Sequence, residues 1–219
     1  MLKIKEEYNK RREEIYYMIH DAYMDKCILE YIERINKLVE RGERHFESNS
    51  KHVMQHMIYL TISDLVLNIC KICHDKKRGE GKKTAIERLE ECLNELLKEK
   101  GLTPIEVVGE ISKEYGDNIK KLADSRNKVI AHNDLDKNEE QNIGTDDIQK
   151  IYKLLNRIID VYNQLSDISV NGKVIKITDD ELEKIEFEVS EGLRRMMSQV
   201  CYRKTSNSLQ GEDENGSKS

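Results

Sequence analysis

The sequence predicts an all-α protein, on the strength of its composition and its hydrophobic periodicity. Of the 219 residues, 36% are charged and 37% are hydrophobic. The charged residues are mostly Lys and Glu, which helix interiors tolerate well. There is one proline and no tryptophan, and apolar residues recur at steps of three and four through most of the chain. This combination is typical of a soluble bundle of helices whose outer faces are strongly solvated.

The first two predicted helices are long. From residue 3 to about residue 41, apolar residues recur at helical spacing, which indicates one long helix or two collinear ones, and Gly42 is a suitable stop. Residues 51–74 form the most apolar segment, with little polar face. A helix that is apolar nearly all round is usually buried on every side, so we expect this one at the centre of the bundle.

The starts of three later helices are marked by capping boxes. Thr84, Thr103 and Thr178 each precede a glutamate by three residues, the pattern in which each side chain bonds the other residue's free backbone N–H. Gly101 fits the end of the helix that Thr84 begins. A further amphipathic helix is predicted from residue 146 to about residue 165, with an apolar seam suited to a partner helix.

Two segments near the end of the chain are not helical in pattern. Within residues 168–177, Asn171 and Gly172 stand between β-branched residues, which predicts a small β-hairpin. Residues 205–219 are polar, and we expect a disordered tail there. The length of the chain suits one core, so residues 1–200 are assigned to a single helical domain.

Charge and hydropathy bear on partners and location. The formal net charge of −5 is not that of a general nucleic-acid binder, so any RNA contact is expected to be local. No run of 18 apolar residues is present, and the first residues are charged, unlike a signal peptide. We therefore expect a cytoplasmic protein without a membrane span. The five cysteines are expected to be free thiols, as is usual in a reducing compartment.

Two patterns resemble cofactor or metal sites. Residues 70–74 read Cys-Lys-Ile-Cys-His, which matches the attachment pattern of a c-type haem. The pattern lies inside the most apolar helix of a chain without an export signal, so we expect no haem and no other cofactor. His52 and His56 are one helical turn apart, but no third ligand is evident, and we expect no metal.

The stretch SRNKVIAHND, residues 125–134, places polar groups in an apolar helix end. Arg126 follows Leu122 by four residues, so it leaves the helix on the side that faces apolar partners. A permanent charge there is costly unless it meets an anion or lies at a wet interface. Asp64 and Asn68 are either polar partners for Arg126 or ordinary polar positions. From periodicity alone, Arg126 and His132 also fit a boundary arginine beside a helix-end histidine.

A basic segment between two predicted helices admits two interpretations. It contains five cations, Lys76, Lys77, Arg78, Lys82 and Lys83. It is either a solvated connection or a local surface that steers an RNA strand toward the protein.

The segment LADSRNKVIAHND resembles the signature of the HEPN superfamily. In that signature an arginine with a polar neighbour is followed a few residues later by a histidine. It is most similar to the AbiU-like branch, which recurs in phage-defence and abortive-infection settings. The resemblance covers roughly residues 50–165. It implies a helical bundle that forms a homodimer, with two copies of the motif meeting across a two-fold axis. It is also compatible with an antitoxin as a partner.

The resemblance also implies a metal-independent endoribonuclease, with RNA as the substrate. His132 would be the general base or acid at a ribose 2′-OH, and Arg126 would hold the scissile phosphate. Asn127 would orient the histidine or a phosphate oxygen. Attack by the 2′-OH would leave a 2′,3′-cyclic phosphate. Two other functions remain open, a HEPN module that binds RNA or nucleotides without cutting, and a helical protein that serves dimerisation or interaction alone.

Overall fold

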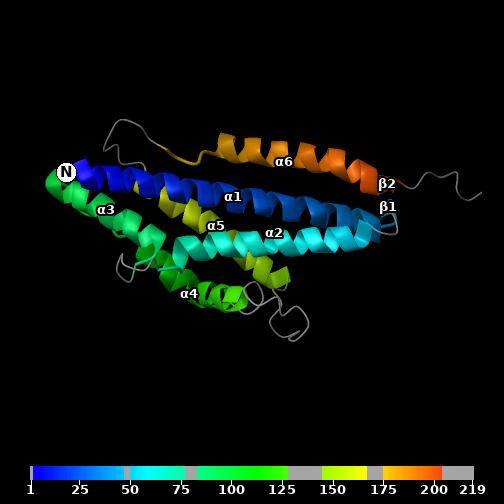
Figure 1. Cartoon of the computed structure of the whole chain (residues 1–219), viewed down its shortest axis with the longest axis horizontal. Coiled ribbons are helices and arrows are strands. Elements are labelled where there is room, and N and C mark those ends of the chain that lie inside the picture. The colour runs from blue at the N-terminus through cyan, green and yellow to red at the C-terminus, as the bar shows by residue number, and fades with distance from the viewer. Residues whose placement is uncertain (1, 47–49, 77–82, 128–144, 167–174, 204–219) are drawn as a thin grey trace, which may run out of the picture.

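The computed structural model describes residues 2–46, 50–76, 83–127, 145–166 and 175–203. This part of the chain is an elongated bundle of helices with one very small sheet, which confirms the predicted all-α class (Figure 1). In order, the elements are α1 (Leu2–Glu40), β1 (Arg44–Phe46), α2 (Ser50–Cys73), α3 (Ala85–Glu99), α4 (Val108–Ser125), α5 (Thr145–Ser166), α6 (Asp179–Val200) and β2 (Cys201–Arg203).

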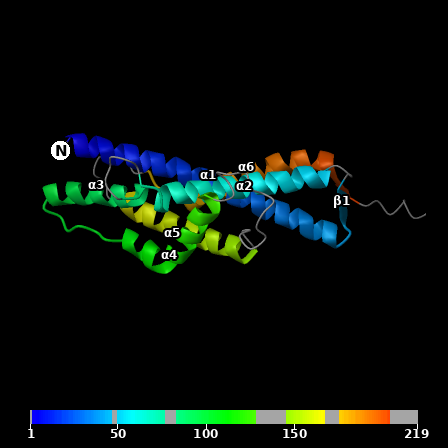
Figure 2. The same cartoon turned by 60° about the horizontal axis from the view of Figure 1, so that its bottom comes forward.

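Helix α1 is the axis of the bundle. It is a single helix, and it contacts α2, α3, α5 and α6. In both views it runs along most of the length of the bundle, with α3 near its beginning and α6 beside its later part (Figures 1 and 2). Gly42, two residues after the helix ends, has a φ of 70°, which glycine adopts without the penalty that a side chain brings. The predicted stop is confirmed.

The expectation that residues 51–74 lie at the centre of the bundle is only half right. The later part of α2 joins the main core with α1, α3, α4 and α5. The earlier part packs through Met54 into a small cluster with Ile32 and Ile35 of α1 and Met197 of α6. No described residue covers its other faces, and Val53 and Leu60 are 56% and 50% exposed. The central helix is α1 instead, because it has neighbours along its whole length.

By length and composition alone, α2 is also the one helix among the described residues that could cross a membrane. A third of the relevant window is buried inside the bundle. A single helix of this kind is weak evidence for a membrane protein, because core helices of soluble proteins pass the same test.

The capping box at the start of α3 is confirmed. The Thr84 hydroxyl accepts from the backbone N–H of Glu87 at 3.4 Å, and the Glu87 carboxylate accepts from the Thr84 N–H at 2.7 Å. Gly101, with φ of 69°, follows the end of the helix as predicted.

The capping box predicted at Thr103 is wrong, because another helix supplies the cap. Helix α4 begins at Val108, and the carboxylate of Glu90 in α3 accepts hydrogen bonds from the N–H groups of Val107 and Val108 at 2.6 and 2.9 Å. The Asn94 side chain bonds both the N–H and the C=O of Ile105, which fixes the segment before α4. The start of α4 is therefore fixed by side chains that lie distant in the sequence.

Helix α6 begins after Thr178, as predicted, and the Thr178 hydroxyl accepts from the backbone N–H of Glu181 at 3.2 Å. The glutamate does not complete the box. Its carboxylate accepts a hydrogen bond from the Tyr16 hydroxyl, which ties the start of α6 to α1.

The sheet in the structure is not the predicted hairpin. Most of residues 168–177 lie outside the described part of the chain, as does the predicted tail over 205–219, and residues 175–177 do not belong to a strand. Ile177 is held instead by the Asn163 side chain, which bonds both its N–H and its C=O. Strands β1 and β2 pair antiparallel, with Arg44 opposite Arg203. This sheet joins the end of α6 to the connection between α1 and α2.

Candidate active site around Arg126

The candidate site lies where the ends of α4 and α2 meet. Helix α4 buries Leu122 and Ala123 in the main core and then widens into a π-type turn at Arg126 and Asn127. Such turns often occur at functional sites. Asp75 lies just beyond the end of α2, and its backbone N–H donates to the carbonyl of Cys70 at 2.8 Å. Two well-packed helices thus present Arg126 and Asp75 to each other.

Arg126 forms an ion pair with Asp75. The guanidinium Nη1 donates to both carboxylate oxygens at 2.6 Å, and the side chains of Arg126 and Asp75 are 17% and 38% exposed. The sequence predicts that a cation in this position needs an anion, and Asp75 is that anion. Asp64 and Asn68, considered as partners from the sequence, have no described contact with Arg126. Asp64 instead lies near Asp25 of α1.

Asn127 covers the other edge of the guanidinium. Its side-chain oxygen accepts from Nε of Arg126 at 3.3 Å and from Nη2 at 3.1 Å. Asn127 is exposed, and its amide is neutral. The two N–H groups that could grip a phosphate side by side are therefore occupied by an acceptor that is weaker than a charged oxygen.

His74 completes the group, and the sequence did not point to it as a site residue. Its Nδ1 lies 3.3 Å from Oδ1 of Asp75, and its side chain is 42% exposed. The same carboxylate therefore contacts both His74 and Arg126. The signal in the sequence was the histidine that ends the haem-like pattern, directly before an aspartate.

These contacts change the ionisation of the pair. Burial acts to raise the pKa of Asp75, but the hydrogen bonds from Arg126 and His74 outweigh it, so the pKa lies below its ordinary value. The hydrogen bond to Asp75 in turn raises the pKa of Arg126. At neutral pH the site therefore holds a carboxylate and a guanidinium, both charged.

Several predicted site residues lie outside the described part of the chain. They are His132 and three cations of the basic segment, Lys77, Arg78 and Lys82. Of the other two cations, Lys76 is exposed and adjoins Asp75, whereas Lys83 forms an ion pair with Glu91 of α3. Lys76 is thus the described member of the segment that adjoins the candidate site.

Four cysteines are free thiols, as expected, namely Cys27, Cys70, Cys73 and Cys92. Burial raises the pKa of Cys70 to about 11 and raises that of Cys73 as well. Both therefore remain protonated at neutral pH and behave as small apolar side chains.

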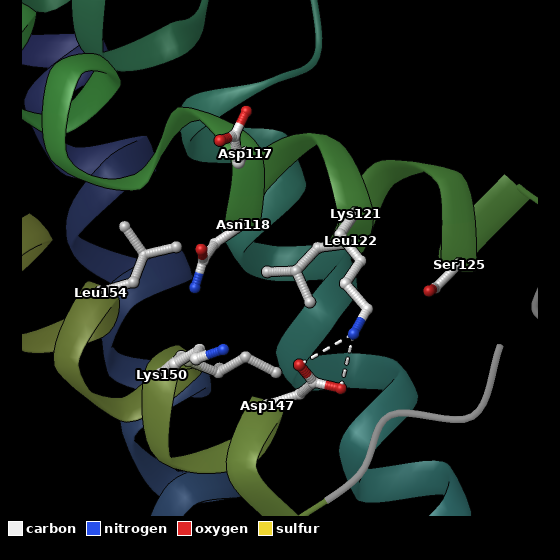
Figure 3. A pocket seen from close by; sticks show the side chains of 9 residues that line it. Asp117, Asn118, Lys121, Leu122, Ser125, Asp147, Lys150 and Leu154 are labelled. Atoms are coloured by element: carbon white, nitrogen blue, oxygen red, sulfur yellow. Dashed lines mark hydrogen bonds and ion pairs between the residues drawn. The ribbon is translucent and has the colours of Figure 1, made fainter. Parts of the chain in front are cut away.

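A pocket of about 140 Å³ lies between α4 and α5, next to the site (Figure 3). Leu122, Ile151 and Leu154 give it apolar walls, and Lys121 and Asp147 form an ion pair at its rim, at 2.8 Å. Ser125, the residue before Arg126, also lines it. Successive helix residues point about 100° apart, so the pocket and the ion pair of Arg126 lie on neighbouring faces of α4.

The fold and the site together define a class, an all-α protein in which an arginine at a helix end forms an ion pair with an aspartate just beyond the end of another helix. Comparison with known families then places it further. The family model described as AbiU2 matches residues 1–181, and the chain belongs to this AbiU2 family of HEPN proteins. The match extends beyond residues 50–165 on both sides. No curated protein and no solved structure gives a significant match.

Proposed function

We propose that this protein is a metal-independent endoribonuclease of the HEPN type that acts in abortive infection. Its membership of the AbiU2 family supports this proposal. The observation that carries it is the state of Arg126. Its guanidinium is anchored through one nitrogen, and among the described residues its other edge contacts only a neutral amide.

The anchored arginine suits the binding of a phosphate. Asp75 holds Nη1, which fixes the plane of the guanidinium without using Nε and Nη2. A phosphate oxygen accepts a stronger hydrogen bond than an amide oxygen does, because it is charged. An incoming RNA phosphate would therefore displace Asn127, an exposed side chain, and take both N–H groups in parallel.

With the phosphate bound to Arg126, RNA cleavage would proceed by attack of the neighbouring 2′-OH. The 2′-OH next to the bound phosphate gives its proton to His132, and the oxygen attacks the phosphorus. Arg126 stabilises the negative charge that builds on the phosphoryl oxygens. The bond to the 5′-oxygen then breaks and leaves a 2′,3′-cyclic phosphate. DNA is not a substrate for this chemistry, because it lacks the attacking hydroxyl.

The segment from Lys76 to Lys83 steers RNA toward the site, a local effect that the acidic balance of the whole chain does not oppose. The protein acts as a cytoplasmic homodimer that brings two motifs together, and an antitoxin partner would control it.

The test is RNA cleavage by the purified protein in the presence of EDTA. We expect the wild type to produce cyclic-phosphate ends, and Arg126→Ala and His132→Ala to lower the rate by about 10²-fold or more. Arg88→Ala is the matched control, because Arg88 also pairs with a carboxylate, that of Glu91, but on the surface of α3. This variant should cleave like the wild type.

The same assay distinguishes the alternatives. Wild-type protein that binds RNA without cutting it would replace the nuclease with a non-catalytic RNA-binding module. Protein that neither binds nor cuts RNA would leave a helical protein of interaction or assembly. Measuring mass in solution at several concentrations tests the homodimer separately.

A further inference from the structure

The proposed reaction moves two protons, and the candidate site has a group for the second one. One proton leaves the 2′-OH, and another must reach the 5′-oxygen when its bond to phosphorus breaks. An alkoxide is a poor leaving group in water, so a general acid beside it accelerates the step. Histidine suits the task because its unperturbed pKa lies near neutrality.

We propose that His74 is this general acid, an inference that rests on the proposed ribonuclease function. It is the histidine that the described structure places in the same group of contacts as Arg126. Its Nδ1 and Nη1 of Arg126 lie 3.3 and 2.6 Å from the same oxygen, Oδ1 of Asp75. One carboxylate thus fixes the phosphate-binding cation and the imidazole relative to each other.

The orientation of the ring supports the role. With Nδ1 directed at Asp75, the N–H on that nitrogen donates to the carboxylate, and Nε2 lies on the opposite edge of the ring. The side chain is 42% exposed, so solvent and substrate can reach the ring. The backbone is held as well, since the N–H groups of His74 and Asp75 both donate to the carbonyl of Cys70, at 2.9 and 2.8 Å.

The step balances without any further reactant. His74 enters as the imidazolium, and its Nε2 gives a proton to the 5′-oxygen as the P–O5′ bond breaks and the bonding pair goes to that oxygen. The proton of the 2′-OH has passed to the base. No electrons are gained or lost, and exchange with water afterwards restores the two groups.

The test compares two RNA substrates with one cleavable linkage each. In one the leaving atom is the natural 5′-oxygen, and in the other it is a bridging sulfur, which leaves as a thiolate and needs no proton. We expect His74→Ala to slow cleavage of the oxygen substrate by about 10²-fold and to leave cleavage of the sulfur substrate near the wild-type rate. Arg126→Ala is expected to slow both, because both substrates carry the phosphate.

His20→Ala is the matched control. His20 also lies beside an aspartate, with its Nδ1 3.7 Å from Asp21, but it is on α1, and no arginine among the described residues pairs with that carboxylate. It should cleave both substrates like the wild type. His74→Gln provides a second variant that keeps a hydrogen-bond donor toward Asp75 but cannot act as an acid, and it should behave like His74→Ala.

The outcomes separate the two proposals. Equal slowing of both substrates by His74→Ala and His74→Gln, or no slowing of either, overturns the role of His74 while the ribonuclease stands. A wild type that cleaves neither substrate overturns the ribonuclease itself, and the general acid falls with it.

Discussion

The two halves of α2 differ in their surroundings, and the second half is also the more apolar. In residues 50–60, Met54 is the one large apolar side chain that is buried, whereas Val53 and Leu60 are exposed to solvent. In residues 61–73, five apolar side chains are at most 1% exposed, namely Leu65, Val66, Ile69, Cys70 and Ile72. In the part of the chain that the structure describes, the second half has α3 and α4 beside it, whereas the first packs on α1 and the end of α6.

The burial of each half of α2 thus follows the helices that lie beside it. It also bears on the candidate site, because the covered half of α2 leads directly to His74 and Asp75. A site is held most accurately when close-packed elements support it. The best-packed part of α2 therefore supports the ion pair between Asp75 and Arg126.

The largest expected effect is that of Leu65→Ala in the covered half. Leu65 is 1% exposed within the main core, so its loss removes buried surface and leaves a cavity. We expect the free energy of unfolding to fall by about 2–5 kcal/mol. Urea unfolding followed by circular dichroism measures it, and a loss below 1 kcal/mol would mean that this half is loosely packed.

Asp75→Asn is expected to have the next largest effect. It removes a charge-assisted pair that is partly open to solvent, for a loss of about 1 kcal/mol at neutral pH. The pKa of Asp75 is lowered in the folded state, so its stabilisation is present above the unfolded pKa and is lost as pH falls through the folded pKa. Wild type and variant should therefore converge in acid, and a constant difference would contradict the assignment.

Asp25→Asn is expected to act in the opposite direction. Burial first, and then the charges of Asp64 and Asp21, raise the pKa of Asp25 to about 7. Its Oδ2 is buried without a hydrogen-bond partner among the described residues. The destabilising effect is absent below the unfolded pKa, grows as pH rises toward about 7 and is constant above that value.

We therefore expect Asp25→Asn to stabilise the protein at pH about 8, by on the order of 1 kcal/mol once solvent screening is allowed for. At pH about 3 the gain should vanish, because the carboxyl is then largely neutral in both states. Thermal unfolding of both proteins at the two pH values provides the measurement. Destabilisation at the higher pH would show that the Asp25 carboxylate has a favourable partner.

The smallest expected effect is that of Leu60→Ala, the counterpart of Leu65→Ala in the open half. Leu60 is 50% exposed, so the change in the free energy of unfolding should stay within about 0.5 kcal/mol. The same urea experiment measures it. A loss as large as that of Leu65→Ala would show that another surface covers this half in solution, and a dependence on protein concentration would identify that surface as a second copy.

Much of the fold could be predicted because helices carry local signals. The 3.6-residue period and the glycine stop located α1, and Thr84 and Thr178 located the starts of α3 and α6. The start of α4 could not be predicted this way, because Glu90 caps it from another helix. The pairing of β1 with β2 could not be predicted from the sequence either, because a three-residue strand is too short to show a recognisable pattern.

The candidate site was predictable in part for the same reason. Periodicity showed that Arg126 leaves α4 on its apolar side, and the energetics of a buried cation then required an anion. Periodicity could not identify the anion, because Asp75 follows a different helix, α2, and its pairing with Arg126 is a tertiary contact. His74 was missed since its sequence context suggested haem attachment rather than a neighbour of Arg126.

The small sheet of β1 and β2 has a consequence for the order of folding. Phe46 of β1 pairs with Cys201 of β2, so bringing the two strands together closes a very long loop and lowers the entropy of the chain accordingly. Contacts of that kind form slowly compared with those between neighbouring helices. We therefore expect α6 to dock last, and a chain cut before Cys201 to show faster amide hydrogen exchange in α6 than in α1.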